Sequence, residues 1–293
     1  KINFHMESIS QEPDYTSLFH RRLLKEYKDF TLIERRKTTL LFRALKSNTE
    51  TPYLIKVFDP QSPAAKNSIL YYSECFVKKV FLQLRFQHNN ILPVVDCDLD
   101  LTEWKLFAVF PYYPTLKQRL ESNAEDVDIS KLFGDIRAAL EYARRDFEVT
   151  HGTLRPELIY YDSVTDNYML SNLTFPFLTL DESSRDYEFH RKYLNEIAAE
   201  YMTPEVKGAG INLEQLDVFL IGLVLIECMG VDRKTFLYLQ QTINDDMHYK
   251  LILRGILGES SETPKGSTQD RNTIFKMLQK DPNARLKLAD ISL

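Results

Sequence analysis

Cysteine is the residue type whose number and spacing bear most directly on metal or disulfide chemistry in this chain. The three cysteines are odd in number and far apart, and no Cys-x-x-Cys pair occurs. Structural zinc sites and disulfide frameworks need closely patterned ligands or paired cysteines. We therefore expect no metal site, no disulfide and a reducing, cytoplasmic (intracellular) location. The cysteines are Cys75, Cys97 and Cys228.

Two further stretches carry side chains that could do chemistry. Asp162 and Asp166 lie in a turn-forming run, where carboxylates usually cap a hairpin that faces solvent. Ser183, Ser184 and Tyr187 lie in a segment of aromatic and charged residues, "FPFLTLDESSRDYEFHRKYLNE". Their hydroxyls are candidate phosphorylation sites, although solvated loop residues are the simpler interpretation.

Charge and hydropathy exclude several classes of function. The 293 residues carry a net charge of −5, so the chain has no basic footprint for DNA or RNA. The longest apolar run, residues 219–230, is twelve residues long and contains Glu227, too short and polar to span a bilayer. No charged-then-apolar leader opens the sequence, so we expect no secretory signal.

The elements that must position any site divide into a β-rich part and a helical part. Runs rich in β-branched and aromatic residues predict strands at 29–35, 38–45, 52–58, 89–100 and 105–113. Ser62 followed by Pro63 predicts a helix start, because serine caps and proline fits the first turn. Apolar residues at helical spacing then predict one long helix with a buried face. That face comprises Ile69, Tyr72, Phe76, Val80 and Leu84.

Beyond residue 114 the pattern is helical at 115–122, 128–147, 213–230, 233–243 and 271–281, with short strands and loops at about 151–206. We therefore expect an α+β fold in two lobes, a small β-rich lobe with one long helix and a larger, mainly helical lobe. The expected divisions are an N-terminal extension (1–27, a tag remnant and an amphipathic helix), a small lobe (28–110), a hinge (111–114) and a large lobe (115–293).

Six short motifs occur in the order of the protein-kinase signature set. The region from about Tyr27 to the C-terminal end of the sequence resembles this family, which implies the bilobal kinase fold. The motifs are "YLIKVFD" (53–59), "HNNIL" (88–92), "HGTLRPEL" (151–158), "EYMTPEV" (200–206), "DVFLIGLVLIECMG" (217–230) and "DPNARL" (281–286).

The residues on which kinase chemistry depends differ at the matching positions. Thr153 stands where the resemblance places the catalytic aspartate, and threonine cannot act as a base at neutral pH. Leu158 and Asn172 stand at the two magnesium-ligand positions, where leucine offers no oxygen and an amide replaces a carboxylate. No glycine precedes Gly134, so the phosphate-binding glycine loop is missing, and "IERRKTTLLFRA" (33–44) is expected to form a plain hairpin.

The nucleotide pocket predicted by the resemblance is altered as well. Lys56 matches the lysine that holds the α- and β-phosphates. Its family partner, a helical glutamate, falls at Lys78, Lys79 or Val80, and none of these is acidic. Leu54 and Tyr160 would fill the space of the adenine ring, with Phe110 as gatekeeper, so we expect no nucleotide, metal or other cofactor.

Positions that support the fold are retained. Glu205 and Arg285 match a buried ion pair, Asp217 matches the aspartate that supports the catalytic loop, and His151 with Leu173 can join the lobes. Retained architecture without the chemistry predicts a pseudokinase that is not an enzyme and acts as a scaffold or allosteric regulator of a protein partner. A nucleotide-binding switch, or an atypical kinase or nucleotide transferase with displaced residues, is the alternative.

The segment "SLFHRRLLKEY" (17–27) is one candidate contact region for a partner. Leu18, Leu23, Leu24 and Tyr27 fall broadly along one helical side. This segment either packs on the small lobe of its own chain, which we favour, or reaches a partner protein.

Overall fold

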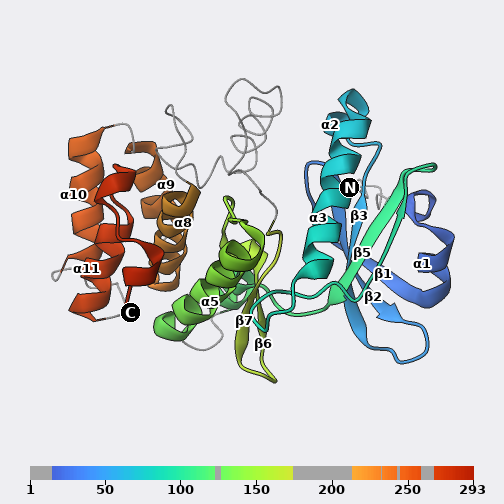
Figure 1. Cartoon of the computed structure of the whole chain (residues 1–293), viewed down its shortest axis with the longest axis horizontal. Coiled ribbons are helices and arrows are strands. Elements are labelled where there is room, and N and C mark those ends of the chain that lie inside the picture. The colour runs from blue at the N-terminus through green and yellow to red at the C-terminus, as the bar shows by residue number, and fades with distance from the viewer. Residues whose placement is uncertain (1–14, 123–126, 174–212, 232, 243–244, 259–266) are drawn as a thin grey trace, which may run out of the picture. The chain divides into compact units, whose positions relative to one another are not determined.

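The computed structural model describes residues 15–122, 127–173, 213–231, 233–242, 245–258 and 267–293. The chain forms two compact units, Lys1–Val80 with Val94–Tyr112 and Phe81–Pro93 with Tyr113–Leu293. Both helices and strands are present, as the expected mixed α+β class requires (Figure 1). The bilobal kinase arrangement and the predicted domain boundaries stay predictions.

The first unit is built on a five-stranded antiparallel sheet with the strand order β1-β2-β3-β5-β4. Each of the five predicted strand regions contributes one strand, although β4 occupies only the last part of the 89–100 run. The strand bounds are β1 Tyr27–Arg35, β2 Thr39–Lys46, β3 Pro52–Phe58, β4 Asp96–Asp100 and β5 Lys105–Pro111.

The central strand β3 presents two buried faces, which explains why its sequence shows little alternation. Ile55 and Val57 point into one apolar core, which also contains side chains of β2, β5 and the N-terminal segment. Lys56 and Phe58 point to the opposite face, because successive side chains of a strand alternate. On that face Phe58 lies 6.1 Å from Phe76 of α3 (Ile69–Arg85), between ring centres.

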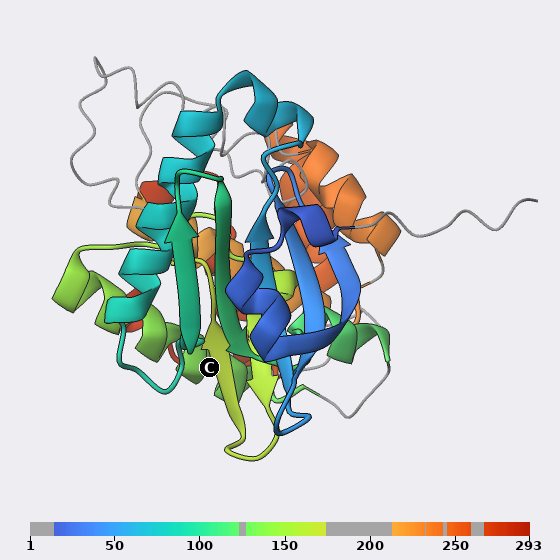
Figure 2. The same ribbon diagram turned by 90° about the vertical axis from the view of Figure 1, so that its right-hand side faces the viewer.

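The N-terminal segment packs on the sheet of its own chain. It forms a short 3-10 helix, η1 (Thr16–Leu18), and then α1 (Arg21–Glu26). Leu23 and Tyr27 are buried in the apolar core that also contains Ile55 and Val57. Leu24, in contrast, is 43% exposed. Figures 1 and 2 show α1 against one face of the sheet and α3 against the other. The expected helix is therefore shorter than 17–27, and Leu24 is not on its buried side.

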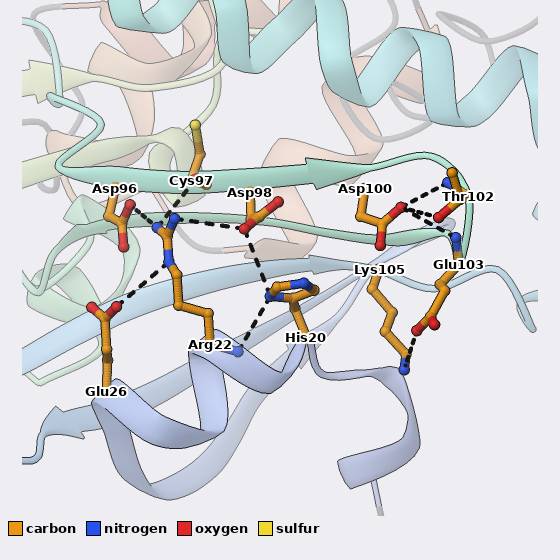
Figure 3. Close-up of polar contacts among 10 residues, drawn as sticks. All are labelled: His20, Arg22, Glu26, Asp96, Cys97, Asp98, Asp100, Thr102, Glu103 and Lys105. Carbon is orange, nitrogen blue, oxygen red and sulfur yellow. Dashed lines mark hydrogen bonds and ion pairs between the residues drawn. The ribbon is translucent and has the colours of Figure 1, made fainter.

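An ionic cluster attaches α1 to the edge strand β4. Arg22 pairs with Asp96, lies 3.5 Å from both Asp98 and Glu26, and donates to the carbonyl of Cys97 at 3.3 Å (Figure 3). Four acceptors around one guanidinium form a network rather than an isolated surface pair. Such a network orients α1 on the sheet as well as stabilising it.

We expect Arg22→Met to lower the free energy of unfolding by about 1 kcal/mol, because several partly exposed ion pairs are lost together. Urea denaturation measures the change, and raising sodium chloride to about 0.5 M should shrink it by screening. Arg21→Met on the same helix, at an exposed position, is the matched control. Equal effects of the two substitutions would contradict a specific role for the cluster.

The predicted long helix begins at the expected place but is divided. Ser62 caps α2 (Pro63–Asn67) by accepting a hydrogen bond from the Ala65 amide at 3.2 Å. The helical path breaks at Ser68, where φ is −158°, and α3 (Ile69–Arg85) follows. Tyr72, Phe76 and Val80 are buried as predicted, Ile69 is half-buried, and Leu84 is 42% exposed, contrary to expectation.

The described part of the second unit is mainly helical and contains one hairpin. Every predicted helical region contains a helix, and residues 218–226 of α8 are apolar on all sides because they cross the core of this unit. The unit also contains a helix that the sequence pattern did not predict, α10. The bounds are α4 Leu116–Glu121, α5 Ile129–Phe147, η2 Pro156–Leu158, β6 Ile159–Asp162, β7 Asn167–Leu170, α8 Leu213–Cys228, α9 Arg233–Gln241, α10 Asp246–Leu257, α11 Thr268–Met277, η5 Pro282–Ala284 and η6 Leu288–Asp290.

Asp162 and Asp166 lie at the β6–β7 turn, as predicted. Asp162 accepts from the amide of Val164 at 2.9 Å and from the hydroxyl of Thr165 at 2.8 Å. Asp162 is buried, however, so it does not face solvent. Among the described residues, no helix combines the length and the apolarity needed to cross a bilayer.

Candidate functional site

One buried carboxylate holds the backbone at the start of the loop at 151–158. Asp217, on α8, accepts hydrogen bonds from the amides of His151 at 2.9 Å and Gly152 at 2.7 Å. Gly152 has φ = 70°, a left-handed conformation that glycine adopts without strain. Burial raises the pKa of Asp217 to about 6, although the two amide donors act in the opposite direction.

His151 positions the same loop and lies in its core. Its Nε2 is 2.9 Å from the carbonyl oxygen of Ser171, which can only accept a hydrogen bond. Its Nδ1 accepts from the amide of Thr153 at 3.3 Å. These two partners assign the proton to Nε2 and leave the fully buried imidazole neutral. The ring therefore ties the loop to the end of the β6–β7 hairpin.

Thr153, Leu158 and Asn172 are the three positions that the resemblance assigns to catalysis. Thr153 is buried, and its hydroxyl lies 3.5 Å from His151 Nδ1. Leu158 is buried too, and its carbonyl accepts from the amide and the hydroxyl of Ser171 at 3.0 and 3.1 Å. Asn172 is half-buried in the left-handed conformation, with φ = 64°. The hydroxyl and the amide offer neutral oxygens, and leucine offers only its backbone.

Lys56 lies in a row of side chains that crosses three strands. It pairs with Leu41 of β2, which pairs in turn with Glu34 of β1. Directly paired residues of antiparallel strands point to the same face of a sheet. Glu34 and Lys56 therefore share the face that packs against α3, where Lys56 Nζ lies 6.0 Å from the centre of the Phe76 ring.

The electrostatic surroundings of Lys56 are mainly positive. Burial, followed by the charges of Lys79 and Arg36, lowers the pKa of Lys56 well below its usual range, and Glu34 acts in the opposite direction. Arg36 donates to the Glu34 carboxylate at 2.7 Å, so this acid is shared between cations. The resemblance predicts a glutamate on the helix that faces Lys56. The helical side chain whose charge acts on Lys56 is instead that of Lys79, which carries the same sign.

We expect Lys56→Met to raise the free energy of unfolding by about 1 kcal/mol at pH 7, because it removes a charge from a half-buried, mainly positive environment. The wild-type chain should gain stability as pH rises above the lowered pKa towards the unfolded value of about 10.4, and the variant should lack this gain. Urea denaturation from pH 7 to 10 measures both effects. Lys78→Met, at an exposed position on α3, is the control, and a lower stability of Lys56→Met would contradict the expectation.

The side chains expected to fill an adenine pocket lie in different units. Leu54 and Phe110 pair across β3 and β5 in the first unit, and both are buried. Tyr160 is buried in the second unit, on β6, and pairs with Met169. Filling of the pocket by Leu54 and Tyr160 therefore remains a prediction.

Arg285 is buried, as predicted, and its guanidinium is surrounded by carbonyl groups. It donates to the carbonyls of Gln279 at 2.6 Å, Gln215 at 2.7 Å and Lys280 at 3.1 Å. Its Cζ lies 4.7 Å from the centre of the Phe219 ring. Glu205, its predicted partner, lies outside the described residues, as do Ser183, Ser184 and Tyr187.

Lys56 was predicted from its motif, whereas the surrounding cations were not predicted as a group. Arg36 lies in the run 33–44, which was expected to form a plain hairpin, and Lys79 was one of three positions that match the family glutamate. The basic run "RRK" (35–37) beside the lysine strand was the available signal. Within the described ranges, no group of three histidine, cysteine, aspartate or glutamate residues is placed to hold a metal ion.

Comparison with known proteins supports a protein kinase-like relationship. No protein-family model matches the chain. A Brassica oleracea var. viridis protein named "Putative serine/threonine-protein kinase receptor" is 26% identical over 188 residues, 59% of this chain and 20% of that protein. An Arabidopsis thaliana protein named "Putative G-type lectin S-receptor-like serine/threonine-protein kinase" is 25% identical over 166 residues, 54% of this chain and 19% of its own length. The match thus spans about a fifth of each relative.

These names contradict one prediction from the sequence. The substitutions at Thr153, Leu158 and Asn172 predicted that the chain is not an enzyme. Both relatives are named as serine/threonine-protein kinases, which contradicts the expectation that the chain is not an enzyme. The prediction drew a conclusion about activity from these aligned positions and from the missing glycine loop, and aligned positions alone do not determine activity.

Proposed function

We propose that this chain is a protein kinase-like domain with the altered catalytic positions of a pseudokinase, acting as a scaffold or allosteric regulator of a partner enzyme inside the cell. In this proposal the sheet unit is the small lobe of a bilobal kinase fold, and the helical unit is the large lobe. The partial similarity to named kinases supports the relationship. The proposed role in protein interaction depends on the loop at 151–158.

The observation that carries the proposal is the contrast within that loop between backbone support and side-chain chemistry. Asp217 and His151 hold the loop with three short hydrogen bonds, so its conformation is well determined. The side chains that this conformation positions are Thr153 and Leu158, which offer no carboxylate. A loop held this firmly is a rigid support for its half-buried side chains, Arg155 and Glu157, and a rigid surface lowers the entropic cost of a regulatory contact.

The test separates protein contact from nucleotide chemistry. A partner identified by cross-linking in the native organism is purified, and its activity is measured with the wild-type chain and with Lys56→Met/Asn172→Ala. We expect both forms to change the partner's activity equally. Lys78→Met, at an exposed position, is the control for a general effect of substitution. A folded double variant that no longer affects the partner would overturn the proposal.

A second candidate function is an atypical kinase, a nucleotide transferase or a nucleotide-binding switch, and the names of the two relatives favour it. Thermal denaturation with ATP, alone and with magnesium or manganese, tests nucleotide binding, since ligand at 100 times its dissociation constant stabilises by about 2.7 kcal/mol. Transfer of labelled γ-phosphate that Lys56→Met abolishes would establish a kinase. Stabilisation without transfer would indicate a switch.

A further inference from the structure

We infer that α10 carries a surface through which two copies of this chain pair about a two-fold axis. The surface is the row formed by Met247, Leu251 and Gly255, hereafter the α10 row. The inference concerns contacts between identical chains, so it goes beyond the proposed regulatory role and does not depend on it. Its support is the exposure, shape and charge of this one helix.

One side of α10 is fixed to its own unit. Tyr249, Leu253 and Ile256 are buried in the apolar core of the second unit, and α10 packs against α9 and α11 (Figure 1). The Tyr249 hydroxyl donates to the carbonyl of Leu278, at the end of α11, at 2.8 Å. The helix is therefore held in place before any partner arrives, which lowers the entropic cost of a contact on its outer side.

The outer side of α10 exposes apolar side chains in one row. Met247 is 83% exposed and Leu251 is 66% exposed. These two residues and Gly255 follow each other at intervals of four, and residues at this spacing form a ridge along one side of a helix. A single exposed apolar side chain is ordinary, but neighbours on one ridge of a fixed helix favour an interaction surface.

The α10 row is complementary in shape to itself. Met247 and Gly255 each lie four residues from Leu251, in opposite directions. A two-fold axis beside Leu251 makes the two helices antiparallel, so Leu251 meets Leu251 of the second copy and Met247 meets Gly255 of the second copy. No atom of the described residues lies within 4 Å of the point where a side chain at Gly255 would begin. The long and adaptable methionine side chain fits the space that this glycine leaves.

Charge favours the same antiparallel arrangement. The N-terminal end of α10 carries Asp245 and Asp246, and its last turn carries Arg254. Antiparallel copies place each acidic end beside the basic end of the other copy, whereas parallel copies would place like charges together and methionine against methionine. Both aspartates already pair with basic side chains of their own chain. The charges at the rim therefore orient the two copies and add little affinity.

The size of the surface predicts a weak dimer. Helix α10 has twelve residues. A pair of such helices buries less than about 1,200 Å² of total surface, the lower limit of a standard protein–protein interface. We therefore expect a dissociation constant of about 10–100 µM, so that the chain is monomeric when dilute and dimeric when concentrated.

The test is sedimentation velocity of the whole chain from about 1 to 500 µM, a range that spans this constant. We expect a reversible equilibrium between monomer and dimer. Leu251→Glu and Leu251→Lys should each raise the dissociation constant at least about tenfold, because like charges then meet on the axis. Leu70→Glu is the matched control, since Leu70 of α3 is also 66% exposed, and it should change the constant less than about twofold.

Two further measurements test the two-fold axis itself. An equimolar mixture of Leu251→Glu and Leu251→Lys should pair at least about fivefold more tightly than either variant alone, because opposite charges then meet on the axis. Gly255→Gln fills the space opposite Met247 and should weaken the dimer at least about fivefold. This variant should unfold in urea at no lower concentration than the wild-type chain, since its new side chain enters open space and glycine is a poor helix former.

Four outcomes would overturn the inference. They are a monomer over the whole concentration range, assembly beyond the dimer, equal weakening by Leu70→Glu and Leu251→Glu, and no recovery in the mixture of charged variants. A monomeric chain whose effect on the partner enzyme is lost in Leu251→Glu would instead assign the α10 row to that partner. Failure of the partner experiment would leave this inference intact, since that experiment does not measure self-association.

Discussion

Arg285→Ala is expected to lower the free energy of unfolding by about 3–5 kcal/mol, the loss typical of breaking a buried, fully bonded charge. Arg285 is 5% exposed and donates to the carbonyls of Gln279, Gln215 and Lys280. Alanine leaves one buried and two partly buried acceptors short of a donor, at up to about 1–3 kcal/mol each before water or rearrangement replaces them. It also removes the cation from the face of Phe219, where it lies at 4.7 Å.

Urea denaturation at pH 7 measures this loss, with Arg254→Ala as the control. Arg254 is exposed in the last turn of α10, so its removal should change stability by less than about 0.5 kcal/mol. Arg285→Ala with a stability equal to that of the control would contradict the described contacts. A double-mutant cycle with Glu205→Ala tests the predicted ion pair separately, since additive losses would exclude coupling.

The stability contribution of Asp217 is expected to fall as pH rises. Its pKa is raised to about 6 in the folded chain, against about 3.9 when unfolded. A raised carboxyl pKa means that the folded state binds the proton more tightly. The favourable contribution is therefore complete below about pH 4 and is lost as pH rises through about 6, a change of about 3 kcal/mol.

Comparison with the variant Asp217→Asn isolates the pH-dependent contribution of Asp217 to the free energy of unfolding. We expect the stability of the wild-type chain relative to Asp217→Asn to decrease by about 3 kcal/mol between pH 4 and pH 8. Urea denaturation at several pH values, with both proteins in the same buffers, measures the difference. Asp146→Asn is an informative control, because a hydrogen bond from the adjacent Arg145 lowers the pKa of Asp146. The stability of the wild-type chain relative to Asp146→Asn should therefore increase slightly with pH, opposite in sign to the change for Asp217→Asn. A difference that is flat or rises with pH would contradict the expectation.

Local sequence patterns predicted most elements of the fold. The β-rich runs correspond to β1–β5 because β-branched and aromatic side chains fit the two buried faces of this sheet. Ser62 and Pro63 correctly marked a helix start. The break at Ser68 was not predicted, because the apolar spacing continues across it. The N-terminal helix is shorter than predicted because Tyr27 pairs with Lys46 and begins β1.

Helix α10 was missed although its apolar residues follow helical spacing. Tyr249, Leu253, Ile256 and Leu257 are all buried, at intervals of four, three and one residues. Asp245 caps the helix by accepting from the amide of His248 at 3.1 Å. Both signals are present in the sequence, so local information is sufficient to predict this helix.

The candidate site divides into a part that motifs predict and a part that only tertiary structure determines. The order of motifs indicated the loop at 151–158 and Asp217, and the hydrogen bonds show how that aspartate supports the loop. The approach of Arg36 and Lys79 to Lys56 depends on strand register and on the rotation of α3. Neither can be derived from one sequence, because a shift by one residue would move each side chain to the other face.

The packing of α1 on the sheet also constrains the order in which the chain can fold during synthesis. Arg22 meets Asp96 and Asp98 across more than seventy residues, and β5, which lies between β3 and β4, is made last of the five strands. While a ribosome is still adding those residues, the buried ring of Phe42 and the apolar side chains of α1 have no complete core to enter. The nascent N-terminal segment therefore stays exposed until β5 is complete near residue 111, and during this interval its apolar side chains are open to aggregation or chaperone capture.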